Sequence, residues 1–138
     1  MNGHFAIDTN VAVYAFSKDE RRTSAMALLE AGPKISIQPL NEFTFVSLRK
    51  RKVPSAEIEE SLDIIERLSD SIRLLAFDTH LQARSLAQGY QLGFYDSFVL
   101  ASAMLDNCDR KYSEDMQHGM VIDGTLTITN PFLPAKTA

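Results

Sequence analysis

The chain has 138 residues, of which 45% are hydrophobic and 23% charged, with only 6 Gly and 5 Pro. This composition is that of a folded protein and excludes a disordered chain, and the length predicts one domain over residues 1–138. Lys and Arg number 14 against 18 Asp and Glu, a net charge of −4. That balance excludes a protein that coats nucleic acid through its overall charge.

Cysteine usage and the apolar pattern indicate the compartment. Cys108 is the single cysteine, which excludes an intrachain disulfide and a multi-cysteine metal site, and we expect it to pack as a small apolar residue. The N-terminal MNGHFAIDTN lacks the basic flank and long apolar stretch of a signal peptide. Nowhere do about 18 apolar residues run together, as a membrane-spanning helix requires. We therefore expect a cytoplasmic protein with no membrane contact.

Short strands and helices are predicted to alternate along the chain. The apolar patterns predict strands at 4–8, 34–37, 72–77, 110–112, 120–122 and 125–129, and helices at 10–16, 22–31, 39–50, 56–69, 79–88 and 95–105. Pro39 is expected at the first position of its helix, Ser55 and Asp78 are expected as N-caps, and Gly89 is expected to end a helix. This alternation predicts a three-layer α/β/α sandwich with a mostly parallel central sheet.

Four acidic residues fall where such a sheet forms its sites, outside the carboxyl ends of its strands. Asp8 ends the first strand, Glu42 lies in the first turn of the helix after the second, Asp96 opens the 95–105 helix, and Asp115 follows the strand at 110–112. Each also has a structural interpretation. Asp8 suits a turn or cap, Glu42 the positive end of a helix dipole, Asp96 an N-cap, and Asp115 a surface loop.

Taken together, the four carboxylates predict a cation site. Clustered carboxylates repel one another, and a bound divalent cation offsets that repulsion. Hard oxygen donors without a Cys or His constellation suit Mg²⁺ or Mn²⁺ and suit zinc poorly. An ion of this kind supports phosphoryl chemistry, because it activates water and stabilises charge on phosphodiester oxygens.

Four segments resemble the acidic motifs of PIN-domain ribonucleases, and specifically of VapC-type toxins from type II toxin–antitoxin modules. They are AIDTN at 6–10, LNEF at 40–43, YDS at 95–97 and SEDMQHG at 113–119, and the similarity extends from Phe5 to about Phe132. The resemblance implies a PIN-like fold and a Mg²⁺- or Mn²⁺-dependent endoribonuclease that hydrolyses RNA phosphodiester bonds. It further implies a homodimer that binds a VapB-type antitoxin, with contact to DNA only through that antitoxin.

The resemblance also implies a role for individual residues. Asp8, Glu42, Asp96 and Asp115 match the acidic metal site, and Thr9 and Ser113 match polar positions that support it through their hydroxyls. Asn10 matches the Asn of the first motif, where it lines the site or caps a helix. Glu114 matches a variable position, so an added ligand and a solvent-facing acid are both open. His118 is a candidate for the site by proximity to Asp115, against a surface histidine.

Two further interpretations stay open. The acidic pocket could belong to a non-catalytic binding or regulatory module of the same fold, which accepts a cationic segment of a partner. An aspartyl-phosphate receiver or phosphatase also uses strand-end aspartates, but it needs a well-placed lysine, for which Lys111 is the one candidate. The basic run Arg49, Lys50, Arg51 and Lys52 suits RNA contact and a solvated helix end equally.

Overall fold

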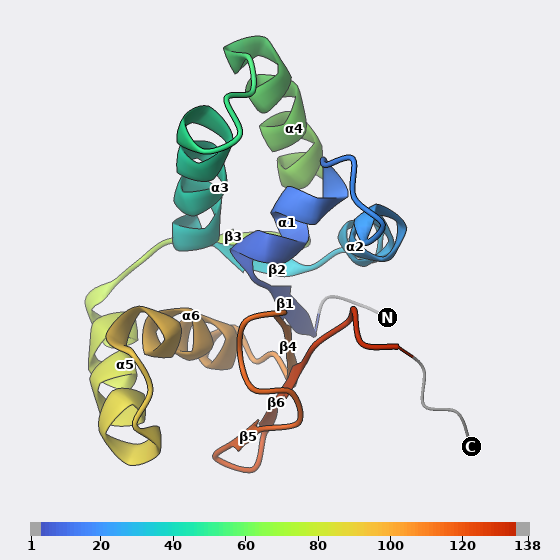
Figure 1. The fold of residues 1–138 in the computed structure, drawn as a ribbon. Helices are drawn as coiled ribbons and strands as arrows, with labels where there is room; N and C mark the ends of the chain where they lie inside the picture. The colour runs from blue at the N-terminus through green and yellow to red at the C-terminus, as the bar shows by residue number, and fades with distance from the viewer. Residues whose placement is uncertain (1–3, 135–138) are drawn as a thin grey trace.

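A six-stranded sheet forms the centre of the computed structural model, which describes residues 4–134 (Figure 1). Its strands are β1 (Phe5–Ile7), β2 (Lys34–Ser36), β3 (Ser71–Arg73), β4 (Arg110–Tyr112), β5 (Val121–Ile122) and β6 (Leu126–Thr129). They lie in the order β3-β2-β1-β4-β6-β5. All neighbouring pairs are parallel except β5 with β6. The predicted mostly parallel sheet is therefore confirmed.

Helices cover both faces of this sheet. They are α1 (Thr9–Ala15), α2 (Arg22–Glu30), α3 (Ile37–Arg49), α4 (Ser55–Leu68), α5 (Phe77–Tyr90) and α6 (Phe94–Leu105). The first four lie on one side and α5 and α6 pack together on the other, as Figure 1 shows. The predicted α/β/α layering is confirmed. Within residues 4–134, no helix is both long enough and apolar enough to span a membrane.

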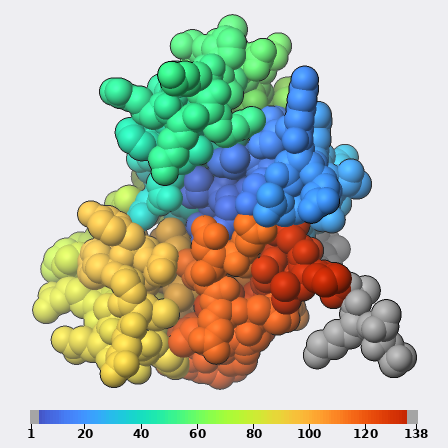
Figure 2. Space-filling view, viewed as in Figure 1, coloured from blue at the N-terminus to red at the C-terminus, as the bar shows by residue number. Residues whose placement is uncertain are grey.

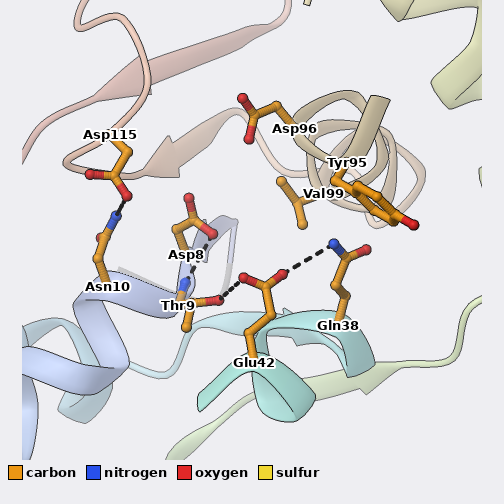
Figure 3. A pocket seen from close by; sticks show the side chains of 9 residues that line it. All are labelled: Asp8, Thr9, Asn10, Gln38, Glu42, Tyr95, Asp96, Val99 and Asp115. Atoms are coloured by element: carbon orange, nitrogen blue, oxygen red, sulfur yellow. Dashed lines mark hydrogen bonds between the residues drawn. The ribbon is translucent and has the colours of Figure 1, made fainter. Parts of the chain in front are cut away.

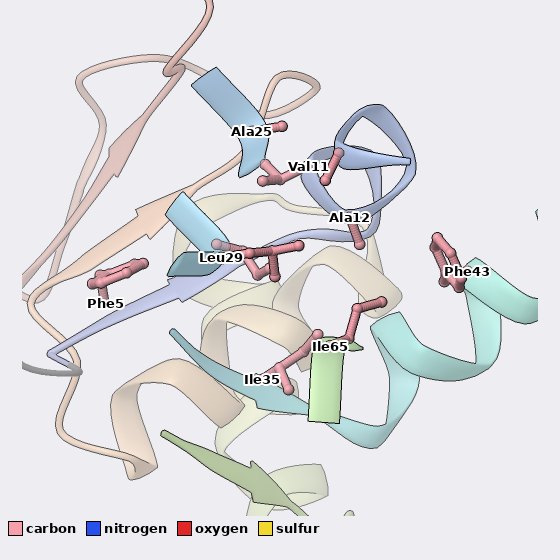
Figure 4. Packing of buried hydrophobic residues seen from close by; sticks show 10 residues of the cluster. Phe5, Val11, Ala12, Ala25, Leu29, Ile35, Phe43 and Ile65 are labelled. Atoms are coloured by element: carbon pink, nitrogen blue, oxygen red, sulfur yellow. The ribbon is translucent and has the colours of Figure 1, made fainter. Parts of the chain in front are cut away.

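The two faces of the sheet build two separate cores because successive residues of a strand point to opposite sides. Phe5 and Ile7 join Leu29, Phe43 and Ile65 in the cluster beneath α1 to α4 (Figure 4). Ala6 instead packs with α5 and α6 in the second cluster, which includes Cys108, buried as predicted. Strand β1 is thus buried along its whole length.

The apolar sides of α1 and α2 are part of the first core. Val11 and Ala12 on α1 and Ala25 and Leu29 on α2 are all at most 1% exposed. These apolar side chains are therefore not free to form a surface for another protein. The large exposed apolar side chains lie elsewhere, chiefly on α3, on the segment between β3 and α5, and at the start of α6.

Several predicted boundaries are wrong, and each has a local cause. Helix α3 begins at Ile37, two residues before Pro39, because the first four N–H groups of a helix have no partner and Pro is tolerated there. Glu42 consequently lies beyond the first turn, which removes the helix-dipole interpretation. Strand β3 stops at Arg73 instead of 77 because its partner β2 offers only three residues for pairing.

The predicted caps differ as well. Pro54, and not Ser55, precedes α4, and Ala76, and not Asp78, precedes α5, so Asp78 lies inside the first turn. Helix α5 continues past Gly89 and its last residue is Tyr90. The residue after it, Gln91, is the C-cap, and its φ of 54° is left-handed. Helix α6 is preceded by Gly93, so Asp96 is not its N-cap.

Candidate active site

The four predicted carboxylates come together at the carboxyl edge of the sheet. Asp8 follows β1, Glu42 lies on α3 after β2, Asp115 follows β4, and Asp96 lies in the first turn of α6. Figure 2 shows the blue N-terminal segment between the green segment above it and the orange segment below it, so parts distant in sequence meet here. A pocket of about 140 Å³ lies among them (Figure 3) and is lined by Asp8, Thr9, Asn10, Gln38, Glu42, Tyr95, Asp96, Val99 and Asp115.

Asp8 is held firmly at the centre of this pocket. Its Oδ1 accepts a hydrogen bond from the backbone N–H of Thr9 at 2.9 Å, so the turn-or-cap interpretation is correct for one of its oxygens. Its Oδ2 accepts from the buried hydroxyl of Ser113 at 2.8 Å. The backbone N–H of Asp8 also donates to the carbonyl of Tyr112 at 3.0 Å, which ties the end of β1 to the end of β4.

Two of the other pocket carboxylates, those of Glu42 and Asp115, are held by polar side chains from α1 and α3. The Thr9 hydroxyl donates to Glu42 at 3.3 Å, and the Gln38 amide donates to the second Glu42 oxygen at 3.1 Å. The Asn10 amide donates to Asp115 at 3.1 Å and its Oδ1 accepts from the backbone N–H of Glu114 at 3.3 Å. Asn10 thus fixes the position of the 113–115 segment.

Negative charge accumulates in the pocket, and no positively charged side chain among the residues described as lining it neutralises that charge. The described lining contains four carboxylates and no Lys, Arg or His. Burial raises the pKa of Asp96, the charges of Asp8 and Asp115 raise it further, and Lys111 acts in the opposite direction. The side chains therefore repel one another as they stand, and a cation in the pocket would relieve that repulsion.

The donor set fits a hard divalent cation in kind, while the present side-chain positions do not form a ligand shell. Among residues 4–134, no three His, Cys, Asp or Glu side chains are arranged closely enough to hold one ion. Glu42, Asp96 and Asp115 are exposed, and exposed side chains change rotamer within nanoseconds. Rotation of these three side chains therefore changes the distances among their carboxylates.

Glu114 is neither a solvent-facing acid nor directed into the pocket. One of its oxygens accepts a hydrogen bond from the Tyr14 hydroxyl, and the other accepts from Arg21 at 2.8 Å. Arg21 also pairs with Asp19 at 2.7 Å and lies over the Tyr14 ring, 3.9 Å from its centre. Both carboxylate oxygens of Glu114 are used to fasten the loop that carries Asp115.

Two other predicted groups lie outside the pocket. His118 accepts a hydrogen bond from the backbone N–H of Asn130 at 2.9 Å and does not line the pocket. The run Arg49, Lys50, Arg51 and Lys52 lies at the end of α3, seven residues or more beyond Glu42, and in it Arg51 bonds to the carbonyl of Phe16.

Three residues that line the pocket were not predicted from the sequence: Gln38, Tyr95 and Val99. Gln38 precedes Glu42 by four residues on one helix, and this spacing is the signal that could have predicted their hydrogen bond. Tyr95 and Val99 come from the start of α6 and line the wall beside Asp96. The contacts of Tyr14 and Arg21 with Glu114 span about ninety residues or more and leave no local pattern.

A family model of the PIN domain matches residues 5–115, more than half of the chain. The chain belongs to the PIN domain family. Its four pocket carboxylates come from the segments that the resemblance to PIN domains singled out, and all nine residues that line the pocket lie inside the matched region. A comparison with curated protein sequences found no significant match.

Solved structures share the PIN fold with this chain at low sequence identity. A chain of a toxin–antitoxin complex from Klebsiella pneumoniae is 22% identical with a TM-score of 0.68, over 92% of this chain and 97% of that chain. VapBC2 from Rickettsia felis, bound to a DNA fragment from its promoter, is 16% identical with a TM-score of 0.67, over 91% of this chain and 98% of that chain. VapC20 from Mycobacterium tuberculosis, a sarcin–ricin loop cleaving toxin, is 19% identical with a TM-score of 0.58, over 78% of this chain and 86% of that chain. At these identities the likeness concerns the fold.

Proposed function

We propose that this PIN domain is a metal-dependent endoribonuclease and the toxin of a type II toxin–antitoxin module. The observation that carries the proposal is the convergence of four carboxylates from four separate segments on one pocket at the carboxyl edge of the sheet. The names of two structural relatives support it, since one is a toxin–antitoxin complex and the other is a sarcin–ricin loop cleaving toxin. We place its action in the cytoplasm, where its RNA substrate is found.

Asp8, Glu42, Asp96 and Asp115 are the residues we propose to hold Mg²⁺ or Mn²⁺. When bound, the cation supplies a Lewis acid that activates water and offsets charge on the phosphodiester oxygens. Neighbouring polar groups orient the carboxylates. Ser113 and the backbone N–H of Thr9 donate to the two oxygens of Asp8, which fixes the direction of that side chain.

The basic run at 49–52 is proposed as a secondary contact with the RNA backbone. Lys50 and Lys52 are exposed and have no hydrogen bond recorded among the described side chains. Replacement of both by Ala should weaken RNA binding uniformly across sequences and reduce its salt dependence by about two phosphate contacts. Unchanged affinity and salt slope in a filter-binding titration would favour a solvated helix end instead.

Partners follow from the same proposal. We propose a homodimer that binds a VapB-type antitoxin and reaches DNA only through it. A dimer interface would have to cover the exposed apolar side chains around α5 and the start of α6, of which Leu74, Phe77 and Tyr95 are each more than 70% exposed. Light scattering of the purified chain gives its oligomeric state. Co-purification with the product of an adjacent small gene tests the antitoxin.

Asp8→Asn provides the sharpest test of the nuclease. RNA cleavage should stop with Asp8→Asn, whereas Asp63→Asn on the exposed side of α4 serves as a matched control and should leave cleavage unchanged. EDTA should abolish cleavage by the wild type and Mn²⁺ should restore it. Mapping new RNA 5′ ends in cells that express wild type or Asp8→Asn then identifies the target. Full activity of Asp8→Asn would refute the proposal.

A binding module without catalysis is the second candidate. The observation in its favour is that the described side chains form no ready ligand shell for an ion. Such a module would show no RNA turnover in EDTA or in Mn²⁺, and it would bind a cationic peptide with an affinity that falls when Asp8 or Asp96 is neutralised. The same chelation experiment therefore separates the two functions.

A further inference from the structure

Lys111 is a lysine buried in the middle of the sheet. It lies on β4, where its register partners are Ala6 on β1 and Ile128 on β6. Both partners belong to the core beneath α5 and α6, and the Lys111 side chain itself is only 2% exposed. A strand position of this kind is ordinarily apolar, since both of its neighbours are.

Burial of an ammonium group requires compensation, because its charge loses the solvation that water provides. The Lys111 Nζ donates to the carbonyl of Ile7 at 3.0 Å, the one hydrogen bond that it makes to the described residues. An ammonium group has three donors, and a carbonyl carries only partial charge. The hydrogen bond therefore accounts for one donor and leaves most of the charge to be balanced by its surroundings.

The surroundings that can balance it are the pocket carboxylates. Ile7 is the residue before Asp8, so the ammonium group reaches the end of β1 from beneath the pocket. Burial lowers the pKa of Lys111, and the charges of Asp8, Glu42 and Asp96 are among the groups that act in the opposite direction. Lys111 in turn counteracts the raised pKa of Asp96.

We propose that Lys111 is the built-in countercharge of the acidic pocket and a positioning residue for Asp8. Its ammonium group offsets the repulsion among the carboxylates when no cation is bound, and its hydrogen bond fixes the carbonyl that precedes Asp8. Only the consequence for metal affinity rests on the proposed function. There, the positive charge of Lys111 opposes a divalent cation in the same pocket and so weakens its binding.

A double-mutant cycle of thermal stability in EDTA tests the countercharge without any metal or activity. Lys111→Met keeps the apolar stem and removes the charge, and Asp96→Asn removes a carboxylate for which the described structure records no hydrogen bond. Lys111→Met should lower Tm by more than 5 °C in the wild type and by a smaller amount in the Asp96→Asn background. Equal losses in the two backgrounds would overturn the proposal.

Lys34→Met is the matched control. Lys34 lies on the neighbouring strand β2 and its Nζ also donates to a backbone carbonyl, that of Asp106 at 2.9 Å. Its loss should destabilise the protein to the same extent in both backgrounds. If Lys111→Met alone does not fold, Lys111→Gln replaces it in the cycle. A Lys111→Met protein that folds only together with Asp96→Asn supports the countercharge.

Metal affinity gives a second and independent measurement. Mn²⁺ should bind Lys111→Met about tenfold more tightly than wild type in a calorimetric titration, because a like charge has been removed. Unchanged or weaker binding would overturn this part of the proposal. If the wild type does not bind Mn²⁺, the proposed metal site fails, while the cycle in EDTA still decides the role of Lys111.

Discussion

Tyr14→Phe tests the attachment of the loop that carries Asp115. The substitution removes the hydroxyl that donates to Glu114 and keeps the ring, which packs edge-to-face on Phe132 at 5.3 Å between centres and lies under Arg21. A hydrogen bond to a charged acceptor contributes about 1.5–3 kcal/mol. The Glu114 side chain is 24% exposed, which reduces the expected loss in unfolding free energy to about 1–2 kcal/mol.

The loss should depend on pH in a defined direction. Burial raises the pKa of Glu114, but hydrogen bonds from Tyr14 and Arg21 and the charge of Arg21 bring it below its ordinary value. A lowered pKa in the folded state means that the stabilisation is fully present above the unfolded pKa of Glu, about 4.3, and is lost as pH falls through the folded pKa. Burial and Glu114 raise the pKa of Tyr14 to about 12, so its hydroxyl stays protonated throughout.

Urea unfolding of wild type and Tyr14→Phe between pH 7 and pH 3, in EDTA, measures the effect. The difference should be about 1–2 kcal/mol at pH 7 and smaller at pH 3, with unchanged m-values. Tyr112→Phe is the control, because the described structure records no hydrogen bond for the Tyr112 hydroxyl. A Tyr14→Phe protein as stable as wild type at pH 7, or a loss independent of pH, would refute the reasoning.

Two further predictions concern the core and the pocket. Ile65→Ala removes a fully buried side chain from the first cluster and should cost about 3 kcal/mol in urea unfolding, whereas Val121→Ala at an exposed position should cost less than about 0.5 kcal/mol. In EDTA, wild type should lose stability as pH rises from the ordinary pKa of Asp through the raised folded pKa of Asp96, because the folded state holds that proton more tightly. Asp96→Asn should remove this part of the pH dependence; an unaltered Tm–pH profile would contradict the assignment.

The sequence predicts the order of the elements and the edge where the carboxylates meet, because both depend on local patterns. Apolar runs give the strands, and the rule that parallel sheets place sites at their carboxyl ends brings Asp8, Glu42 and Asp115 together. The ends of elements are less well predicted, since they depend on partners. Strand β3 is short because β2 is short, and Asp78 lies within α5 because the helix begins earlier, at Phe77.

The contacts that support the site could not be predicted in this way. Glu114 is held by Tyr14 and Arg21 from the other end of the chain, and the burial of Lys111 depends on its register between β1 and β6. A sequence pattern indicates which face of a strand is apolar, but it does not indicate which distant charge lies beyond the end of that strand.

Because β1 is buried, the Asp8 side of the pocket is stiffer than the Asp115 side. Asp8 directly follows a strand whose three residues are each at most 5% exposed, so its backbone should open only with global unfolding. Asp115 is exposed, on a loop fastened by Asn10 and by Glu114. We expect amide exchange to be slow at Ile7 and faster after Ser113. If the pocket binds a cation as proposed, adaptation to cations of different radius would come from displacement of the Asp115 side, while the Asp8 side would stay fixed.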